Sequence, residues 1–157
     1  MKLANPSLLD VLYVTRNLRE WDRRELFATR FDDDPDRLAM DVMGWGPVGW
    51  VAGGVVDGRE KASAVVGATE LWPGMWSVGM FATDDFPKIG LGLTRFVKRR
   101  MIPLIVQQGI RRGECKSIEG HTEAHRWLEV LGARRDGAAL RGYGKGGEPF
   151  YTYAWEF

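Results

Sequence analysis

Several features that mark secreted, membrane or nucleic-acid-binding proteins are missing from this sequence. Its single cysteine, Cys115, cannot form an internal disulfide, which predicts a protein of the reducing cytoplasm. The 22 Lys and Arg residues nearly balance the 21 Asp and Glu residues, so a net charge of +1 gives no overall attraction to nucleic acid or membranes. Apolar runs are far too short to span a membrane, and residues 1–6 do not resemble the start of a signal peptide.

Glycine and tryptophan, in contrast, are abundant, with 20 and 7 of the 157 residues. The length suits one domain, and the chain has no internal repeat, low-complexity tract or linker. We therefore expect a single domain over residues 1–157.

The first half of the chain predicts a strand, two helices and then three strands. Residues 8–15 are aliphatic and β-branched, as in a first strand. The capping-box pattern that begins at Asn17 predicts a helix to about residue 29, and Asp34-Pro35 begins a second, shorter helix that ends at Gly44. Three strands separated by the turn signals Asp57-Gly58 and Pro73-Gly74 follow at residues 48–56, 62–72 and 75–82.

The second half predicts a helix, a strand, a helix and two strands. Apolar residues recur at helical spacing over residues 90–109, and Pro103 is expected to kink or divide this helix. A short strand at residues 114–119 precedes a helix that ends at Gly132, and the last two strands are expected at residues 133–141 and 149–156. The resulting order, β-α-α-β-β-β-α-β-α-β-β, predicts a mixed α/β sheet rather than a doubly wound one.

The most informative stretch lies between the last central strand and the next helix, and it reads Phe86-Pro87-Lys88-Ile89-Gly90-Leu91-Gly92-Leu93. A pyrophosphate needs several convergent backbone N–H groups, which a glycine turn at the positive end of a helix dipole would provide. Gly90 and Gly92 also fit a plain tight turn before a helix. A Rossmann motif lacks its third glycine here, and a Walker P-loop lacks its Gly-Lys-Ser/Thr.

The order of elements, with a glycine turn after the fourth strand, resembles the GNAT acyltransferase superfamily. In that superfamily's motif Arg/Gln-x-x-Gly-x-Gly/Ala, Gly90 and Gly92 match and Pro87 replaces the Arg or Gln. Its later motif, Asn-x-x-Ala-x-x-x-Tyr-x-x-x-Gly-Phe, aligns with residues 121–133. There Ala124 and Gly132 match, whereas His121, Leu128 and Ala133 replace the Asn, Tyr and Phe.

This resemblance implies a GNAT-like acyl-CoA N-acyltransferase fold and an acetyl-CoA-dependent N-acetyltransferase that acts on an unknown amine of a small molecule or protein. It places the pantetheine arm of acetyl-CoA on the strand backbone at Met80, Phe81 and Ala82. His121 stands where the superfamily has a pantetheine-contacting Asn, which implies a hydrogen-bonding role. The pyrophosphate would contact the residues of the glycine turn: Lys88, Ile89, Gly90, Leu91, Gly92 and Leu93.

Acyl transfer to an amine needs a base for the ammonium and an acid for the leaving thiolate. Glu70 is the first candidate base, followed by Asp84 and Asp85, although each also fits a solvated carboxylate at the rim. Leu128 replaces the superfamily's tyrosine acid. Tyr143, in the glycine-rich loop, is therefore the substitute candidate, and it also fits a surface aromatic residue.

Metal binding and nucleophilic catalysis are both disfavoured. His121 and His125 have a spacing that suits zinc, but no third ligand is evident, so no metal is expected. Cys115 falls in a predicted strand, which favours a small buried hydrophobe over a nucleophile.

Three short stretches, residues 17–25, 123–128 and 151–155, resemble a narrower family of small GNAT-like proteins encoded by short-tailed bacteriophages. Some members of that family are associated with the assembly of internal virion proteins. The resemblance implies an alternative function, a non-catalytic protein of the host cytoplasm that binds a host enzyme or assists virion assembly. Basic pairs are scattered along the chain, which argues against a nucleic-acid-binding surface.

Overall fold

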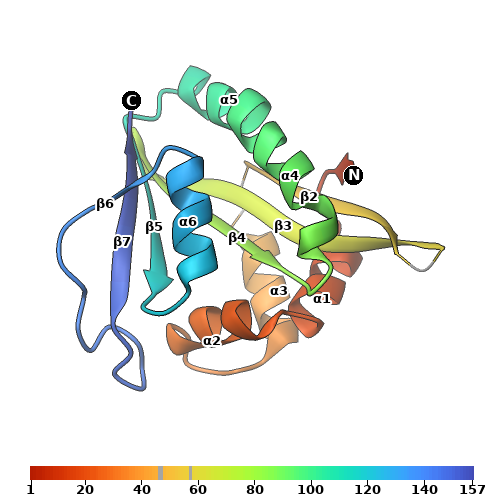
Figure 1. Cartoon of the computed structure of the whole chain (residues 1–157), viewed down its shortest axis with the longest axis horizontal. Helices are drawn as coiled ribbons and strands as arrows, with labels where there is room; N and C mark the ends of the chain where they lie inside the picture. Colours follow the sequence, from red (N-terminus) through yellow and green to blue (C-terminus); the bar gives the residue numbers. More distant parts are fainter. Residues whose placement is uncertain (46–47, 57) are drawn as a thin grey trace.

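The computed structural model describes residues 1–45, 48–56 and 58–157 and places them in a central mixed sheet with helices on both faces (Figure 1). One helical turn, η1 (Val97–Met101), is π-helical. In chain order the elements are β1 (Lys2–Ala4), α1 (Leu8–Arg16), α2 (Glu20–Ala28), α3 (Pro35–Gly44), β2 (Val48–Val56), β3 (Arg59–Trp72), β4 (Met75–Ala82), α4 (Phe86–Phe96), η1 (Val97–Met101), α5 (Ile102–Gln107), β5 (Arg112–Ile118), α6 (Thr122–Val130), β6 (Arg134–Arg135) and β7 (Phe150–Glu156).

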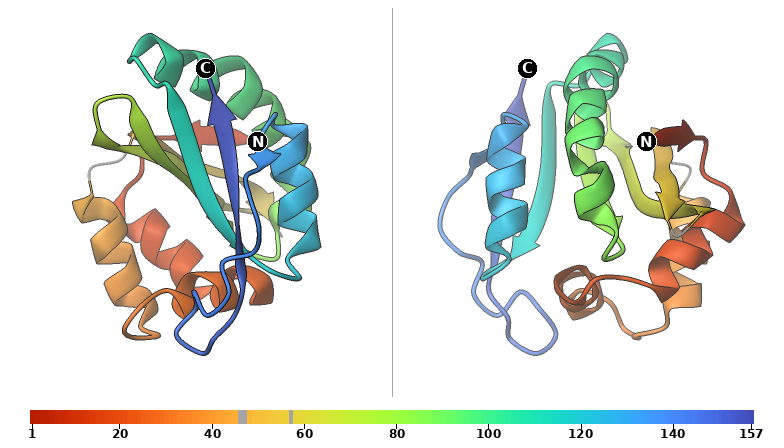
Figure 2. Two further views of the ribbon diagram at one scale, coloured as in Figure 1. Left: turned by 90° about the vertical axis from the view of Figure 1, so that its left-hand side faces the viewer. Right: turned by 45° about the vertical axis from the view of Figure 1, so that its right-hand side comes forward.

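The sheet has seven strands in the order β1-β2-β3-β4-β5-β7-β6. Every neighbouring pair is antiparallel except β4 and β5, which run parallel. Helices α4, α5 and α6 cover one face, and α1, α2 and α3 lie on the other (Figure 2). The expected mixed α/β class is therefore confirmed. No helix in the described ranges is both long and apolar enough to cross a membrane.

The first predicted strand is wrong, because residues 8–16 form helix α1. Ser7 caps this helix, since its side chain accepts a hydrogen bond from the backbone N–H of Asp10. Val11, Val14 and Thr15 are fully buried, and their spacing forms a helical stripe that outweighs the strand propensity of an aliphatic run. The strand that opens the sheet is instead β1, which pairs with β2.

Asn17 ends α1 and does not cap the next helix as predicted. Its side-chain amide donates to the backbone oxygen of Tyr13 at 2.8 Å, and α2 begins after Arg19. The predicted start of α3 is confirmed, because the carboxylate of Asp34 accepts hydrogen bonds from the N–H groups of Asp36 and Arg37.

The three central strands agree with the sequence, apart from a start of β3 at Arg59. Of the predicted Asp57-Gly58 turn, Asp57 lies outside the described residues, while Gly58 has a φ of +73°. Helix α6 also ends as predicted, with Gly132 at a φ of +94°.

Pro103 divides the long helix as predicted. In the turn before it, η1, the N–H of Ile102 bonds to the oxygen of Val97, five residues earlier. Pro103 has no N–H and would crowd the carbonyl four residues back, so the wider π-helical turn accommodates its ring. The α-helical hydrogen-bond pattern resumes as α5 only after this turn.

The strand predicted over residues 133–141 is largely wrong, because only Arg134–Arg135 pairs with β7 as a ladder. Gly137 and Gly142 have φ values of +80° and +70°, which an extended strand does not contain. The chain therefore leaves the sheet as a long loop before it returns as β7.

Candidate functional site

Strands β4 and β5 separate after a short paired stretch. They pair only from Met75 to Ser77 on β4 and from Arg112 to Glu114 on β5. Beyond these residues β4 stays with β3 as far as Ala82, and β5 stays with β7 as far as Ile118. The diverging edges line a cleft of about 710 Å³ that reaches residues on both faces of the sheet.

The free edge of β4 exposes backbone polar groups to this cleft. Alternate residues of a strand direct their N–H and C=O groups to opposite sides. The N–H of Ala82 points away from β3, because it donates to Oδ2 of Asp22 at 2.7 Å. Met80 and Val78 share this direction, and both line the cleft. The N–H of Val78 belongs to the last β4–β5 pair, opposite Glu114. The carbonyl of Val78 and both backbone groups of Met80 therefore face the space that β5 has left.

Helix α2 closes the wide end of the gap with two carboxylates, Asp22 and Glu25. Asp22 holds β4 through the N–H of Ala82, and Oε2 of Glu25 holds β5 through the N–H of Ile118 at 2.8 Å. Oε2 of Glu25 also accepts a hydrogen bond from the hydroxyl of Ser117 at 2.7 Å. We call the opening framed by residues 78–81, residues 115–117 and these two carboxylates the window.

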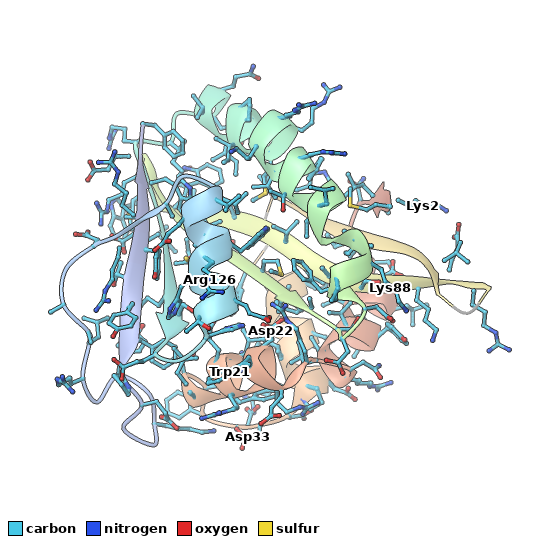
Figure 3. All side chains as sticks on the ribbon, in the orientation of Figure 1. Lys2, Trp21, Asp22, Asp33, Lys88 and Arg126 are labelled. Atoms are coloured by element: carbon cyan, nitrogen blue, oxygen red, sulfur yellow. The ribbon has the colours of Figure 1, made fainter. Side chains whose placement is uncertain are left out.

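His121 joins the two carboxylates at the window. Its Nδ1 lies 3.2 Å from Oε2 of Glu25, and its Nε2 lies 3.7 Å from Oδ1 of Asp22. His121 is only 2% exposed, and its ring stacks on Trp21 at a centroid distance of 5.6 Å. Figure 3 shows Trp21 and Asp22 on α2 below the start of α6, from which Arg126 projects. A carboxylate only accepts hydrogen bonds, so a hydrogen bond between His121 and Glu25 needs the proton on Nδ1.

Burial controls the charges around the window. Desolvation raises the pKa of Asp22 above its usual value, although the guanidinium of Arg19, 2.9 Å away, opposes this effect. Burial also raises the pKa of the Cys115 thiol to about 12. Cys115 is therefore a protonated thiol near neutral pH, although it is half-buried at the cleft wall rather than fully buried as expected from the sequence.

Four of the predicted catalytic and cofactor-binding residues line the cleft, namely Met80, Phe81, His121 and Tyr143. Glu70 does not, because its Oε1 accepts a hydrogen bond from the N–H of Gly74 and so braces the turn between β3 and β4. Asp84 is exposed, and Asp85 pairs with Lys88 at 2.7 Å. The positions of these three carboxylates therefore do not support a catalytic role.

The expected glycine turn is wrong in its backbone conformation, because residues 86–96 are helical. The first-turn N–H groups, which a helix leaves free for an anion, are already used. Those of Asp85 and Phe86 donate to the hydroxyl and carbonyl oxygens of Thr83, and that of Lys88 donates to the oxygen of Asp85. Pro87 has none. Within the described chain, this helix start offers no backbone cradle to a diphosphate.

Aromatic side chains also cover the predicted pyrophosphate position. The ring of Phe86 lies so close to Gly90 that a Cβ there would come within 3.3 Å of it. Trp127 of α6 meets Phe86 edge-on, and its indole N–H donates to the hydroxyl of Thr94 at 2.8 Å. Helices α4 and α6 are thereby tied together beside Gly90.

Sequence reasoning missed Asp22 and Glu25. Both lie in the first helix that was recognised from its capping pattern, three residues apart and therefore on one face. Two acids at helical spacing, with Trp21 four residues before Glu25, were the available signal. In the described part of the chain, no group of His, Cys, Asp and Glu residues is arranged to hold a metal ion.

Comparison with known proteins relates the chain to others through structure only. No protein-family model matches the sequence. No curated protein matches it either. Among solved structures, the chain is similar to the ribosomal-protein-alanine N-acetyltransferase of Brucella melitensis, at a TM-score of 0.74, 11% identity and 100% coverage of both chains.

Two further structures are similar over nearly the whole chain. Ard1 from Thermoplasma volcanium has a TM-score of 0.72 and 17% identity, with 99% of this chain and 96% of that chain covered. A GCN5-related N-acetyltransferase from Kribbella flavida has a TM-score of 0.69 and 17% identity, with coverage of 99% and 97%. The resemblance to bacteriophage proteins stays a prediction. The chain has the fold of the GNAT acetyltransferases.

Proposed function

We propose that this protein transfers an acyl group from a pantetheine thioester to an amine. The free edge of β4 from the carbonyl of Val78 to Met80 is the observation that carries the proposal. A pantetheine arm contains two amide groups, which can pair with a strand edge in the way that an added peptide strand does. The window beside this edge leads from the face under α4 and α6 to the face under α2.

The reaction needs one proton acceptor and one group that stabilises the oxyanion. The amine nitrogen attacks the thioester carbonyl carbon, a C–N bond forms, the C–S bond breaks, and the thiolate leaves. We assign the amine proton to Glu25, whose contacts with Ser117, Ile118 and His121 all fall on Oε2. Oε1 takes none from the residues described, and Glu25 lines the cleft. The N–H group of Met80, which lies beyond the last β4–β5 pair, is suited to the oxyanion.

The leaving thiolate takes up its proton without a dedicated acid. Leu128 occupies the place of the superfamily's tyrosine and is buried. An ordinary thiol has a pKa of about 8.5, so a thiolate released near neutral pH is protonated by water. Tyr143 lines the cleft, but its ring is 45% exposed and packs against Phe150, which supports a role in the wall of the cleft.

Release of thiol from acetyl-pantetheine and from acetyl-CoA, measured against a panel of peptides and small primary amines, tests the proposal. We expect amine-dependent thiol release that Glu25→Gln slows and Glu70→Gln does not. Acyl transfer would be rejected if a folded protein, shown by its cooperative unfolding, released no thiol from acetyl-pantetheine or acetyl-CoA with any of the amines.

A second candidate function is binding of a protein partner without turnover, as implied by the bacteriophage resemblance. The N–H groups in the first turn of α4 favour this function, because they are already hydrogen-bonded within the protein and cannot bind the diphosphate of an acyl donor. In that case a partner of the chain would be captured equally by the wild type and by Glu25→Gln. Loss of capture in this variant would connect the partner to the window.

A further inference from the structure

The strand edge at the window and the start of α4 beside it fit different parts of an acyl donor. The edge of β4 suits the pantetheine arm, whereas the first turn of α4 has no N–H group left for the diphosphate of free coenzyme A. A donor with the same arm but no diphosphate would avoid this conflict. Phosphopantetheine attached to a carrier protein is such a donor, because it joins the arm to a serine through one phosphodiester.

The helix beside the window has a strongly biased charge. From Phe86 to Gln107 the chain carries five cations and no acid, although the whole protein is almost neutral at +1. The cations are Lys88, Arg95, Lys98, Arg99 and Arg100. Lys88 pairs with Asp85, so the remaining four form the cluster of interest.

These four cations are exposed on the helix whose buried side lines the cleft. Val97 and Met101 of η1 are buried and line it, whereas Lys98, Arg99 and Arg100 between them are exposed. The π-helical turn therefore has an apolar inner side at the cleft and a cationic outer side. Lys98 reaches across to α6, where its Nζ donates to the oxygen of Val130 at 3.2 Å.

No acid of the described chain pairs with Arg95, Arg99 or Arg100, which stand free on the surface. Arg95 and Arg99 are one turn apart, a spacing at which like charges destabilise a helix. An unneutralised cluster of this kind attracts an acidic partner and speeds its association. The side chain of Val130 beside Lys98 is 56% exposed, which adds an apolar contact to the cationic surface.

The cluster is also badly placed for the diphosphate of a free coenzyme. At a rise of about 1.5 Å per residue, Arg95 lies about 14 Å and Arg100 about 21 Å along the helix from Phe86. A phosphate at the helix start would not reach the far members of the cluster. A docked protein covers on the order of 800 Å² on each partner, which spans this distance easily.

We infer that the outer side of α4 and η1, comprising Arg95, Lys98, Arg99 and Arg100, docks an acidic carrier protein that presents the acyl group on phosphopantetheine. This inference rests on the proposed function, since the thioester would enter the same window. The transfer step is unchanged. The C–N bond forms as the C–S bond breaks, and the carrier leaves with a free thiol.

Titration calorimetry with three donors tests the inference: an acetyl-loaded acidic acyl carrier protein, acetyl-CoA and acetyl-pantetheine. In Arg99→Glu/Arg100→Glu, we expect affinity for the loaded carrier to fall at least about tenfold more than affinity for acetyl-pantetheine. The matched control is Arg134→Glu/Arg141→Glu, the same charge change at exposed positions away from α4, which should bind the carrier like the wild type. Urea unfolding of each variant checks that the fold is intact.

A second measurement does not depend on any variant. Carrier binding by the wild type should weaken steeply with salt, whereas acetyl-pantetheine binding should not. Equal losses for the carrier and acetyl-CoA in the charge-reversed variant, or tight binding of acetyl-CoA alone, would overturn the inference and assign the cations to coenzyme phosphates. Acetyl-pantetheine binding with no carrier binding also overturns it and leaves the proposed function standing. Failure to bind any of the three donors would overturn both this inference and the proposed function.

Discussion

Glu25 on α2 accepts a hydrogen bond from the backbone N–H of Ile118, so a side chain from the start of the sequence holds the end of β5. The N–O distance is 2.8 Å, and the two residues are 93 positions apart. Three residues before Glu25, Asp22 holds the end of β4 in the same way. The width of the window is therefore set by α2, which bridges two strands that no longer pair with each other.

Glu25→Gln should slow acyl transfer by about 100-fold, because general-base catalysis contributes about this much or more. The amide can still accept a hydrogen bond from Ile118, so the fold and donor binding should be retained. Steady-state kinetics should show the loss in kcat, with donor affinity measured separately by calorimetry.

Glu70→Gln is the natural control for this variant, because Glu70 braces a hairpin turn outside the cleft lining. A loss of activity at Glu70 comparable to that at Glu25 would contradict the assignment of the base.

Gly79→Leu should block the cleft without harming the fold. Gly79 lines the cleft, and a Cβ at this position would meet nothing within 4 Å. A larger side chain would displace the reactants, and a misplacement of about 1 Å can reduce the rate about 100-fold. Transfer kinetics and urea unfolding, measured on the same preparation, separate the two effects.

Gly44→Leu is a matched control, since a Cβ at Gly44 also meets nothing within 4 Å and this residue lies outside the cleft lining. If both glycine variants retain full activity, the reaction does not use this part of the cleft.

Asp22 should make the stability of the protein depend on pH. Burial raises its pKa above the usual 3.8, so the folded state binds this proton more tightly than the unfolded state. The resulting stabilisation is complete below pH 3.8 and is lost as the pH rises through the raised pKa. The free energy of unfolding of the wild type should therefore fall relative to that of Asp22→Asn between about pH 4 and neutrality.

Urea unfolding of both proteins across this pH range measures the difference. Asp33→Asn alters a carboxylate that is paired with Lys145 at the surface. The free energy of unfolding of this variant should differ little from that of the wild type across the same pH range. A wild-type advantage over Asp22→Asn that grows as the pH rises would be inconsistent with the raised pKa.

Cys115 should resist alkylation while the chain is folded. The rise in its pKa from 9.0 to about 12 reduces the thiolate population near neutral pH by about 1,000-fold. Because the folded state holds this proton, its contribution to stability is complete below pH 9.0 and is lost as the pH approaches 12. Iodoacetamide labelling followed by mass spectrometry, with and without urea, tests this expectation.

Cys115→Ala should keep most of the transfer activity, because a protonated thiol is not a nucleophile. Rapid labelling of the folded chain at neutral pH, together with loss of activity in this variant, would reopen a role for the thiol.

Local patterns predicted most of the fold. The central strands follow from alternation and turn residues, α3 from Asp34-Pro35, and the division of the long helix from Pro103. Residues 8–16 were misassigned because an aliphatic run satisfies both a strand and a buried helix, and only packing against the sheet distinguishes them. The motif comparison identified the correct fold, although it put a turn where the structure has the first two turns of α4.

The candidate site was much less predictable. Met80, Phe81 and His121 were placed near the donor arm from motif positions alone, and the structure brings them to the cleft. Glu25 escaped notice because its partners, Ser117, Ile118 and His121, come from distant parts of the chain. A helix carboxylate has no local signal for such contacts.

The amino-acid sequence by itself determined the mixed α/β class, the positions of the main turns and the cationic character of the helix from Phe86 to Gln107. These properties depend on neighbours within a few residues, whose spacing and charge can be read directly. Only the tertiary structure decided that β4 and β5 part after three paired residues, that α2 bridges the gap, and that Thr83 and Asp85 use the N–H groups at the start of α4. Those features depend on how separate elements pack, because a hydrogen bond across the sheet leaves no trace in the local pattern of either partner.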